Sequence, residues 1–379
     1  SIVVDGVELT IDDCQFGCEE WEGISGTGFI ISRNSYYQDF TTAFLIGGAS
    51  AAIFTDNIFQ SDETGIGIDI NYISSTLYFV IAGIYSAGNQ FNNCFNGIRT
   101  NFLSLGLFDN NSTFSGCYAG ILSNASNIYL NDSRFDDCFY GIQANHLSQI
   151  NMLGGGTTIN FENCAIGIEA NYSTFANIID SKFETNVSNS AATTGVIGKF
   201  DSNLKVSGCS FDISSPVATW NVFILSDQSR VIASGNVIDI PNGTNSHGFH
   251  CSLSPYTELS DNTISLSSPN IEPNSYAGFW MGGNYFSSID RLLIHEGNEF
   301  NSNISVHRCG KTAVYDNFFN YPSEIYSVFG FTKNNLFCNN IFEGGHSLRL
   351  ENGCFPTKLG TSEFRDADSG LEINDPGLG

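Results

Sequence analysis

The residues best suited to chemistry gather between positions 291 and 349, in a chain where basic side chains are scarce. They are Arg291, His295, Glu296, Glu299, His307, Arg308, Lys311 and Arg349. β-Elimination in a polysaccharide of uronate units needs a base that removes a proton and a cation that neutralises the carboxylate. The catalytic residues of such a lyase would be Arg291, His295, His307, Arg308, Lys311 and Arg349, with carboxylate-bound calcium as its cofactor. The competing interpretation is solvated surface charge.

Other catalytic arrangements are incomplete. A glycoside hydrolase needs two carboxylates around one bond, but the pairs Asp12-Asp13 and Asp136-Asp137 are isolated, where the chain needs polar turn residues. His247 and His250 are three residues apart, and such residues on a strand face opposite sides, so they predict no metal site. No phosphate-binding loop, nucleophile elbow or zinc spacing occurs.

A third kind of site would use aromatic rings as platforms for sugars. The candidate binding residues are Trp220, Phe279, Trp280 and Tyr285. Flat aromatic faces suit pyranose rings, but packing of long loops explains the same residues. Both interpretations stay open at this point.

The elements that must position these residues are visible in a phrase that recurs between Asn89 and Asn171. It reads Phe-x-x-Cys-x-x-Gly-Ile and begins at Phe91, Phe114, Phe135 and Phe161. Such short units exclude helix pairs, and the segments between them alternate apolar and polar residues. Three short strands per unit, each above its equivalent in the previous unit, predict an all-β fold: a single right-handed parallel β-helix of about 15 rungs.

In such a coil each inward position becomes a ladder of like residues. One ladder would contain the four Phe residues of the phrase, and a second ladder beside it Cys94, Cys117, Cys138 and Cys164. The glycines of the phrase are Gly97, Gly120, Gly141 and Gly167. They fit a corner that needs either positive φ or the absence of a Cβ, and the Ile after each points inward.

One domain is expected over residues 1–379. It comprises irregular first rungs at 1–55, regular repeats at 56–200, rungs with long loops at 201–295, and closing rungs at 296–379. One further rung fits between Phe16 and Phe59, with Tyr36 and Tyr37 in a loop. Turn-rich insertions within 212–222, 239–250 and 267–286 should protrude and carry binding. Neither end has an amphipathic capping helix, so we expect continuation into a longer chain or contact with other subunits.

The chain carries a formal charge of −25, from 39 acidic and 14 basic residues. This balance argues against nucleic acid as a partner, because such binding depends on Lys and Arg. No run of 18 apolar residues predicts a membrane span. Of the 11 cysteines, the repeated ones are expected to be buried small hydrophobes, and Cys14 and Cys18 are the pair best placed to bond if any do.

The Asn-x-Phe-x-x-Cys-x-x-Gly-Ile phrasing resembles the right-handed β-helix repeats of the pectate-lyase-like superfamily, over about residues 56–372. Its Asn-rich, Cys-containing form is similar to that of very large secreted surface proteins of gliding bacteria of the Bacteroidota type. The group of basic residues from Arg291 to Arg349 resembles the arrangement in alginate- and chondroitin-type lyases. The superfamily includes lyases, hydrolases, phage tailspikes and adhesins, so the fold alone does not select a function.

The sequence favours a structural or adhesive role over an enzyme, because most of its repeats form ladders that give length and stiffness, and no complete catalytic set occurs. We therefore expect a rigid, extracellular segment of a cell-surface protein or appendage. Its partners would be neighbouring modules or copies of itself, with a cell-surface glycan as a further candidate. The alternatives are a lyase acting on an acidic polysaccharide and a non-catalytic glycan-binding module.

Overall fold

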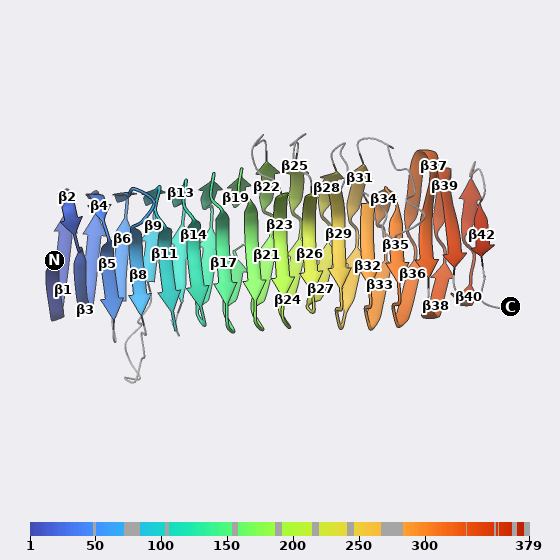
Figure 1. The fold of residues 1–379 in the computed structure, drawn as a ribbon, viewed down its shortest axis with the longest axis horizontal. Coiled ribbons are helices and arrows are strands. Elements are labelled where there is room, and N and C mark those ends of the chain that lie inside the picture. The colour runs from blue at the N-terminus through green and yellow to red at the C-terminus, as the bar shows by residue number, and fades with distance from the viewer. Residues whose placement is uncertain are drawn as a thin grey trace. The chain divides into compact units, whose positions relative to one another are not determined.

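The computed structural model describes residues 1–47, 51–71, 84–102, 106–153, 158–185, 192–213, 220–240, 246–266, 283–330, 332–351, 354, 356–365 and 370–374. All regular elements in these ranges are β-strands, and strands of successive turns pair in parallel (Figure 1). The chain divides into two compact units, Ser1–Glu184 (unit 1) and Thr185–Gly379 (unit 2). The expected all-β parallel β-helix is confirmed, whereas the single-domain organisation stays a prediction.

Each turn of unit 1 contributes one strand to each of three sheets. The first sheet contains β2 (Gln15–Trp21), β4 (Tyr36–Phe40), β7 (Ile58–Gln60), β10 (Gln90–Asn92), β13 (Thr113–Ser115), β16 (Arg134–Asp136), β19 (Asn160–Glu162) and β22 (Lys182–Thr185). The second contains β5 (Thr42–Gly47), β8 (Ile66–Asn71), β11 (Asn96–Asn101), β14 (Ala119–Asn124), β17 (Tyr140–Asn145) and β20 (Ile166–Asn171). The third contains β6 (Ala51–Thr55), β9 (Ile84–Ala87), β12 (Leu107–Asn110), β15 (Asn127–Asn131), β18 (Gln149–Met152) and β21 (Phe175–Ile179). The long strands β1 (Ile2–Asp12) and β3 (Ile24–Arg33) pair with each other, and β3 continues into both the second and the third sheet by pairing with β5 and β6.

Unit 2 repeats this arrangement. Its first sheet contains β25 (Ser210–Ile213), β28 (Val237–Ile240), β31 (Thr263–Leu266), β34 (Glu299–Asn301), β37 (Phe318–Gly330), β39 (Ile341–Glu351) and β41 (Glu363–Arg365). The second contains β23 (Ala192–Lys199), β26 (Trp220–Asp227), β29 (Ser246–Ser252), β32 (Gly283–Ser287), β35 (Ile304–His307) and β42 (Leu371–Asn374). The third contains β24 (Asn203–Ser207), β27 (Arg230–Ser234), β30 (Thr257–Ser260), β33 (Arg291–His295), β36 (Lys311–Tyr315), β38 (Lys333–Cys338) and β40 (Pro356–Leu359).

Among the described residues the first sheet contains eight strands in unit 1 and seven in unit 2, close to the about 15 rungs expected. Some turns are not built from three separate strands. β3 pairs with both β5 and β6, and β37 pairs with both β34 and β35, so one long strand takes the place of two. None of the described segments is a helix with the length and apolarity needed to cross a lipid bilayer.

The phenylalanines of the phrase form a buried stack in unit 1. The rings of Phe91, Phe114, Phe135 and Phe161 have consecutive centroids 4.8, 4.8 and 4.9 Å apart, with planes within 6° of parallel. Beside them Cys94, Cys117, Cys138 and Cys164 are buried free thiols. The isoleucines that follow the glycines, Ile98, Ile121, Ile142 and Ile168, are fully buried. The core of the unit therefore lies between the three sheets.

The glycines of the phrase lie inside the second strands, and close approach is the reason for them. A Cβ added to Gly120 would lie 2.6 Å from Cδ1 of Phe135 and 2.8 Å from the carbonyl oxygen of Gly141. Positive φ falls instead on the residue directly before each repeated Cys. These residues are Asn93, Gly116, Asp137 and Asn163, with φ of 51°, 63°, 52° and 54°. Their types tolerate the left-handed conformation.

One expectation about the first rungs is wrong. Tyr36 and Tyr37 lie in β4 and not in a loop, and Tyr37 is fully buried. Its ring stacks on Phe16 at 5.2 Å and on Phe59 at 5.0 Å, so Tyr37 occupies the rung that the spacing between those residues left open. Cys14 is a free thiol, and the side chain of Cys18 lies outside the described residues.

Asp109 is a buried carboxyl group in unit 1, and it predicts a pH-dependent stability. Ser112 Oγ donates to its Oδ1 at 2.7 Å and Ser133 Oγ to its Oδ2 at 2.6 Å. Burial raises the pKa of Asp109, and the serine hydrogen bonds oppose this only in part. Below the unfolded-state pKa of about 4, both states are protonated. As the pH rises above it, only the unfolded chain loses the proton, so stability falls until the pH passes the folded-state pKa.

We therefore expect Asp109→Asn to remove this loss. The urea midpoint of the variant should gain on that of the wild type as the pH is raised from 4 to 8. Asp132→Asn, at an exposed position in the same unit, controls for the removal of one negative charge. Midpoints of wild type and Asp109→Asn that stay a constant distance apart over this pH range would contradict the assignment.

Candidate functional site

The outward face of the third sheet of unit 2 carries a row of three cations and one tyrosine, here called the basic row. Its members are Arg230, Tyr256, Arg291 and Lys311. Arg291 pairs in register with Lys311, and Tyr256 precedes Thr257, which pairs with Leu292 next to Arg291. The three cations are exposed, whereas the residues that follow them, Val231, Leu292 and Thr312, are buried. Alternation along each strand thus turns the row outward.

Two guanidinium groups hold the ring of Tyr256 between them in the row. The guanidinium carbon of Arg230 lies 4.7 Å from the ring centroid, and that of Arg291 lies 5.5 Å from it. Cation–π contacts of this kind contribute about 0.5–1 kcal/mol each at exposed sites. The tyrosine therefore restricts two long side chains that would otherwise be free to move, and keeps their charges on one face.

A hydrogen-bonded chain runs beside the row. The Tyr256 hydroxyl donates to Glu258, and Glu258 Oε1 lies 3.1 Å from Nε2 of His295. The ring of His295 in turn stacks on Tyr315, with centroids 5.4 Å apart. Partial burial acts to raise the pKa of Glu258, but the bonds from Tyr256 and His295 outweigh it and lower that pKa. Glu258 is therefore an ionised anchor that fixes Tyr256 and His295.

The pKa of Tyr256 is raised, first by burial and then by the hydrogen bond to Glu258 and its charge, although Arg291 and Arg230 act in the opposite direction. A phenol that is to remove a proton needs a lowered pKa. The raised pKa therefore disfavours Tyr256 as a general base, whereas its ring remains available for contact with a ligand.

The cations of the basic row form no direct ion pair with the carboxylates that the structure describes. In the described part of the chain, no ion pair joins Arg230, Arg291 or Lys311 to a carboxylate. Four cations elsewhere are paired: Arg99 with Asp69, Arg134 with Glu162, Lys182 with Glu184, and Arg365 with Glu363. The carboxylate of Glu258 interacts electrostatically with Arg230. In a chain with a formal charge of −25, three cations on one face without a direct ion pair still make a local site for anions.

The structure separates the residues grouped as a lyase site. Arg291, His295 and Lys311 lie together on the third sheet, but His307 is in β35 of the second sheet. Arg308 follows it with φ of 54°, and Arg349 in β39 pairs with Val328. The six residues of the expected lyase site therefore do not form one group. They lie on different sides of the coil, because each turn changes direction at its corners.

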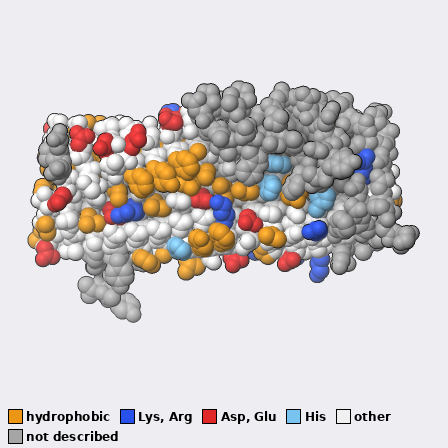
Figure 2. All heavy atoms as spheres, viewed as in Figure 1, with side chains coloured by type: hydrophobic (Ala, Val, Ile, Leu, Met, Phe, Trp, Pro, Cys, Tyr) orange, Lys and Arg blue, Asp and Glu red, His pale blue; other side chains and the backbone are white. Residues whose placement is uncertain are grey.

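A second group of imidazoles lies on that second sheet. The ring centroids of His250 and Tyr285 are 5.0 Å apart, and those of Tyr285 and His307 are 6.1 Å apart. Figure 2 shows histidine side chains close together on this face of unit 2. The expectation that His247 and His250 face opposite sides is wrong, because β29 has a register irregularity between them and their ring centroids lie 5.3 Å apart.

Of the aromatic binding candidates, Tyr285 alone is placed with its ring. Phe279 and Trp280 lie outside the described residues, and so does the side chain of Trp220. Binding was expected in the loops 212–222, 239–250 and 267–286, and their parts 214–219, 241–245 and 267–282 also lie outside the described residues. Residues 220–222, 246–250 and 283–286 of these ranges belong to strands. Among the residues that are described, no three His, Cys, Asp or Glu side chains converge as metal ligands would.

Sequence reasoning missed Arg230 and Tyr256, which complete the row. Each stands one residue before the first buried residue of a strand in the third sheet, and these buried residues are Val231 and Thr257. The same position holds Arg291 and Lys311 in the next two turns. This shared position was the available signal, but the varying lengths of the intervening loops hide it in the linear sequence.

No family model and no curated protein sequence matches the chain. Among solved structures, a mutant of the periplasmic alginate epimerase AlgG is 11% identical with a TM-score of 0.36, and the match covers 98% of this chain and 78% of that one. A mutant tailspike protein of E. coli bacteriophage HK620, in complex with a hexasaccharide, is 9% identical with a TM-score of 0.35, covering 97% and 73%. Neither likeness is strong enough to equate a residue of those proteins with one here.

Proposed function

We propose that the chain is a rigid segment of an extracellular surface protein that adheres to an acidic glycan through the basic row. One observation supports the binding part: Arg230 and Arg291 hold the ring of Tyr256 between them, and Lys311 is next in register to Arg291. These three cations are exposed and form no ion pair in the described residues. Guanidinium and ammonium groups only donate hydrogen bonds, and guanidinium matches carboxylate and sulfate groups with two parallel bonds. Acidic sugars along the row would meet three such groups over four turns, with Tyr256 in the turn between Arg230 and Arg291.

The structural part of the proposal rests on the ladders. Stacked rings, thiols and isoleucines fix each turn on the next, and repeat proteins of this kind are stiffened by such contacts between neighbours. Other modules of a longer chain, or further copies of this one, would be its partners in an assembly. A stiff support that presents a cationic face suits attachment better than turnover.

The alternative of a lyase has one specific feature in its favour, the hydrogen-bonded Tyr256–Glu258–His295 chain next to Arg291. The raised pKa of Tyr256 speaks against its use as the base at neutral pH. Adhesion without cleavage is therefore the function that the site supports better.

The proposal is tested by electrophoresis of the full chain through gels that contain polygalacturonate, alginate or chondroitin sulfate. We expect retardation that weakens as salt is added, since exposed charges are screened. Arg230→Ala and Arg291→Ala should each weaken binding about tenfold, because a hydrogen bond to a charged group contributes about 1.5–3 kcal/mol.

Arg134→Ala is the matched control, because Arg134 is exposed but already paired with Glu162 in unit 1. Its retardation should equal that of the wild type. Binding to none of the three polysaccharides, or equal losses in Arg134→Ala and Arg291→Ala, would refute the role of the row. Release of unsaturated sugar ends during incubation would establish the lyase in its place.

A further inference from the structure

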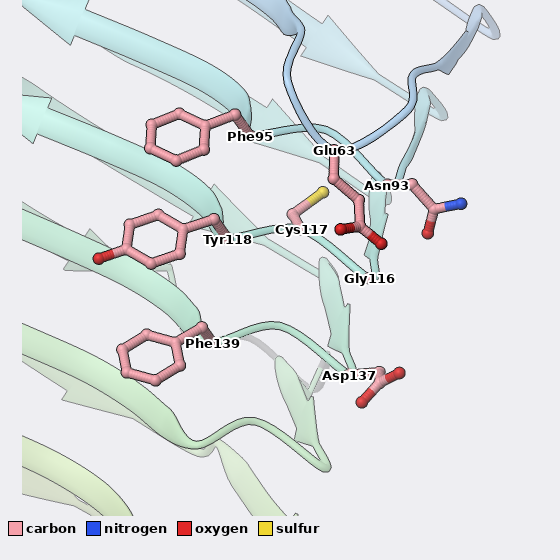
Figure 3. Close-up of a pocket in the computed structure, with 8 residues that line it drawn as sticks. All are labelled: Glu63, Asn93, Phe95, Gly116, Cys117, Tyr118, Asp137 and Phe139. Carbon is pink, nitrogen blue, oxygen red and sulfur yellow. The ribbon is translucent and has the colours of Figure 1, made fainter.

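Unit 1 carries a furrow on the corner between its first and second sheets. Its volume is about 500 Å³, and eight residues line it: Glu63, Asn93, Phe95, Gly116, Cys117, Tyr118, Asp137 and Phe139. Figure 3 shows the rings of Phe95, Tyr118 and Phe139 side by side along one wall, with Glu63, Asn93 and Asp137 on the other. The two walls repeat from turn to turn, because the residue before each repeated Cys and the residue after it both point outward.

The aromatic wall is an exposed stack. The ring centroids of Phe95 and Tyr118 lie 4.8 Å apart, and those of Tyr118 and Phe139 lie 5.4 Å apart. Their side chains are 42%, 43% and 47% exposed, in the same order. Exposed aromatic side chains in one contiguous group mark interaction surfaces more often than isolated ones do.

The stack ends where the neighbouring turns supply small residues. Phe95 N–H donates to the carbonyl of Gly65 in the turn before, and Ala165 follows Cys164 in the turn after Phe139. Within the described residues no further ring stacks in parallel beyond Phe95 or Phe139, but the ring of Tyr140 packs edge-on against Tyr118 and Phe139, with centroids 5.6 and 4.7 Å apart. Since neighbouring rings cover one another's faces, the exposed part of the stack is mainly its ring edges, which form an apolar strip for a flat surface such as the C–H face of a pyranose.

The opposite wall sets the charge of the ligand. Glu63, Asn93 and Asp137 are exposed, and no cation is among the lining residues. Carboxylates accept hydrogen bonds and repel other anions. Hydroxyl groups are the donors that fit this wall, whereas uronates and sulfated sugars do not. On the viewed face of unit 1, Figure 2 shows a band of hydrophobic side chains beside acidic ones.

We propose that this furrow binds an uncharged polysaccharide, a chain of hexose rings that lies along the turns. The edges and ends of the aromatic stack would meet the apolar face of the sugars, and Glu63, Asn93 and Asp137 would accept hydrogen bonds from their hydroxyls. The ligand differs in class from the acidic glycan assigned to the basic row, and none of the lining residues belongs to that row. The two sites therefore stand or fall separately.

The test is binding of the full chain to an array of neutral glucans, mannans and galactans. We expect the wild type to bind at least one of them, and Phe139→Ala to bind it about tenfold less tightly, since aromatic contacts contribute about 0.5–1.5 kcal/mol beyond burial. Asp137→Asn should also weaken binding, and it preserves the fold because Asn tolerates the φ of 52° at this position.

Phe108→Ala is the matched control. Phe108 is 41% exposed and stacks on Tyr129 at 4.6 Å, but it belongs to the third sheet and does not line the furrow. The control should bind as the wild type does. Binding to no neutral polysaccharide would overturn the proposal, as would equal losses in Phe108→Ala and Phe139→Ala. So would concentration-dependent self-association that Phe139→Ala abolishes, because the occupant would then be a second copy of the chain.

Failure here is distinguishable from failure of the proposed function. Arginine variants of the basic row should leave neutral-glycan binding unchanged, and Phe139→Ala should leave retardation in polygalacturonate unchanged. If only acidic polysaccharides bind and only the arginine variants lose them, the furrow proposal fails and the function proposed above survives.

Discussion

Phe135→Ala is expected to lower the free energy of unfolding by about 3–5 kcal/mol, the usual cost of deleting a buried aromatic side chain. The ring is fully buried and stacks on Phe114 at 4.8 Å and on Phe161 at 4.9 Å. Gly120 lies against it, with its ideal Cβ position 2.6 Å from the ring edge. Neighbouring turns cannot close the cavity, because their own hydrogen bonds fix their spacing. Urea denaturation of the full chain measures the loss.

Two comparisons make this prediction specific to the ladder. Phe135→Leu keeps most of the apolar volume and should cost less than the alanine variant. The exposed ring of Phe108 also stacks on a neighbour, Tyr129, but Phe108→Ala leaves no enclosed cavity and should cost less than about 1 kcal/mol. If Phe108→Ala and Phe135→Ala lost the same free energy, stacking itself and not enclosure would be the source of stability.

The buried half of the structure could be predicted because its chemistry repeats. Phe114 and Phe135 occupy the same place in successive phrases, and a residue that recurs at each turn of a parallel coil must stack on itself. Ile121 and Ile142 follow the same rule. Even the need for glycine was visible in the sequence, and the structure shows that close approach, not positive φ, explains Gly120.

Departures from the regular repeat could not be predicted in the same way. Tyr37 occupies a ladder place without the surrounding phrase, so its sequence resembles a loop more than a rung. The irregularity in β29 brings His247 and His250 together, and a bulge reverses the alternation on which the sequence argument depended. In both cases the backbone pairing of a distant turn decides the local conformation.

The candidate sites were only partly predictable for a related reason. Arg291 and Lys311 were recognised by their local density of charge, and they do lie side by side. Arg230 and Tyr256 join them through register across turns of unequal length. The furrow of unit 1 was present in the phrase as the aromatic residue after Cys94, Cys117 and Cys138. That residue points outward, so an argument based on the core passes over it.

Asn298→Leu should be the most damaging substitution in unit 2, with an expected loss of about 3 kcal/mol or more, because each buried polar group left without a partner costs about 1–3 kcal/mol. Asn298 is fully buried. Its Nδ2 donates to the carbonyls of Leu259 and His295 at 3.0 and 2.7 Å, and to Oδ1 of Asn317 at 2.9 Å. Its Oδ1 accepts from the backbone N–H of Asn262 at 3.0 Å and from Nδ2 of Asn262 at 2.9 Å. Leucine has similar volume but can make none of these bonds.

A half-buried asparagine in unit 1 provides the control for this prediction. Asn124 Nδ2 donates to Oδ1 of Asn101 at 2.8 Å, and its Oδ1 accepts from Asn145 at 3.3 Å. Water can replace these bonds at a partly exposed position, so Asn124→Leu should cost less than about 1 kcal/mol. Urea denaturation of both variants separates two explanations of the asparagine ladders. A large loss at Asn298 alone attributes stability to the enclosed polar groups, whereas equal losses would attribute it to side-chain stacking, which the two ladders share.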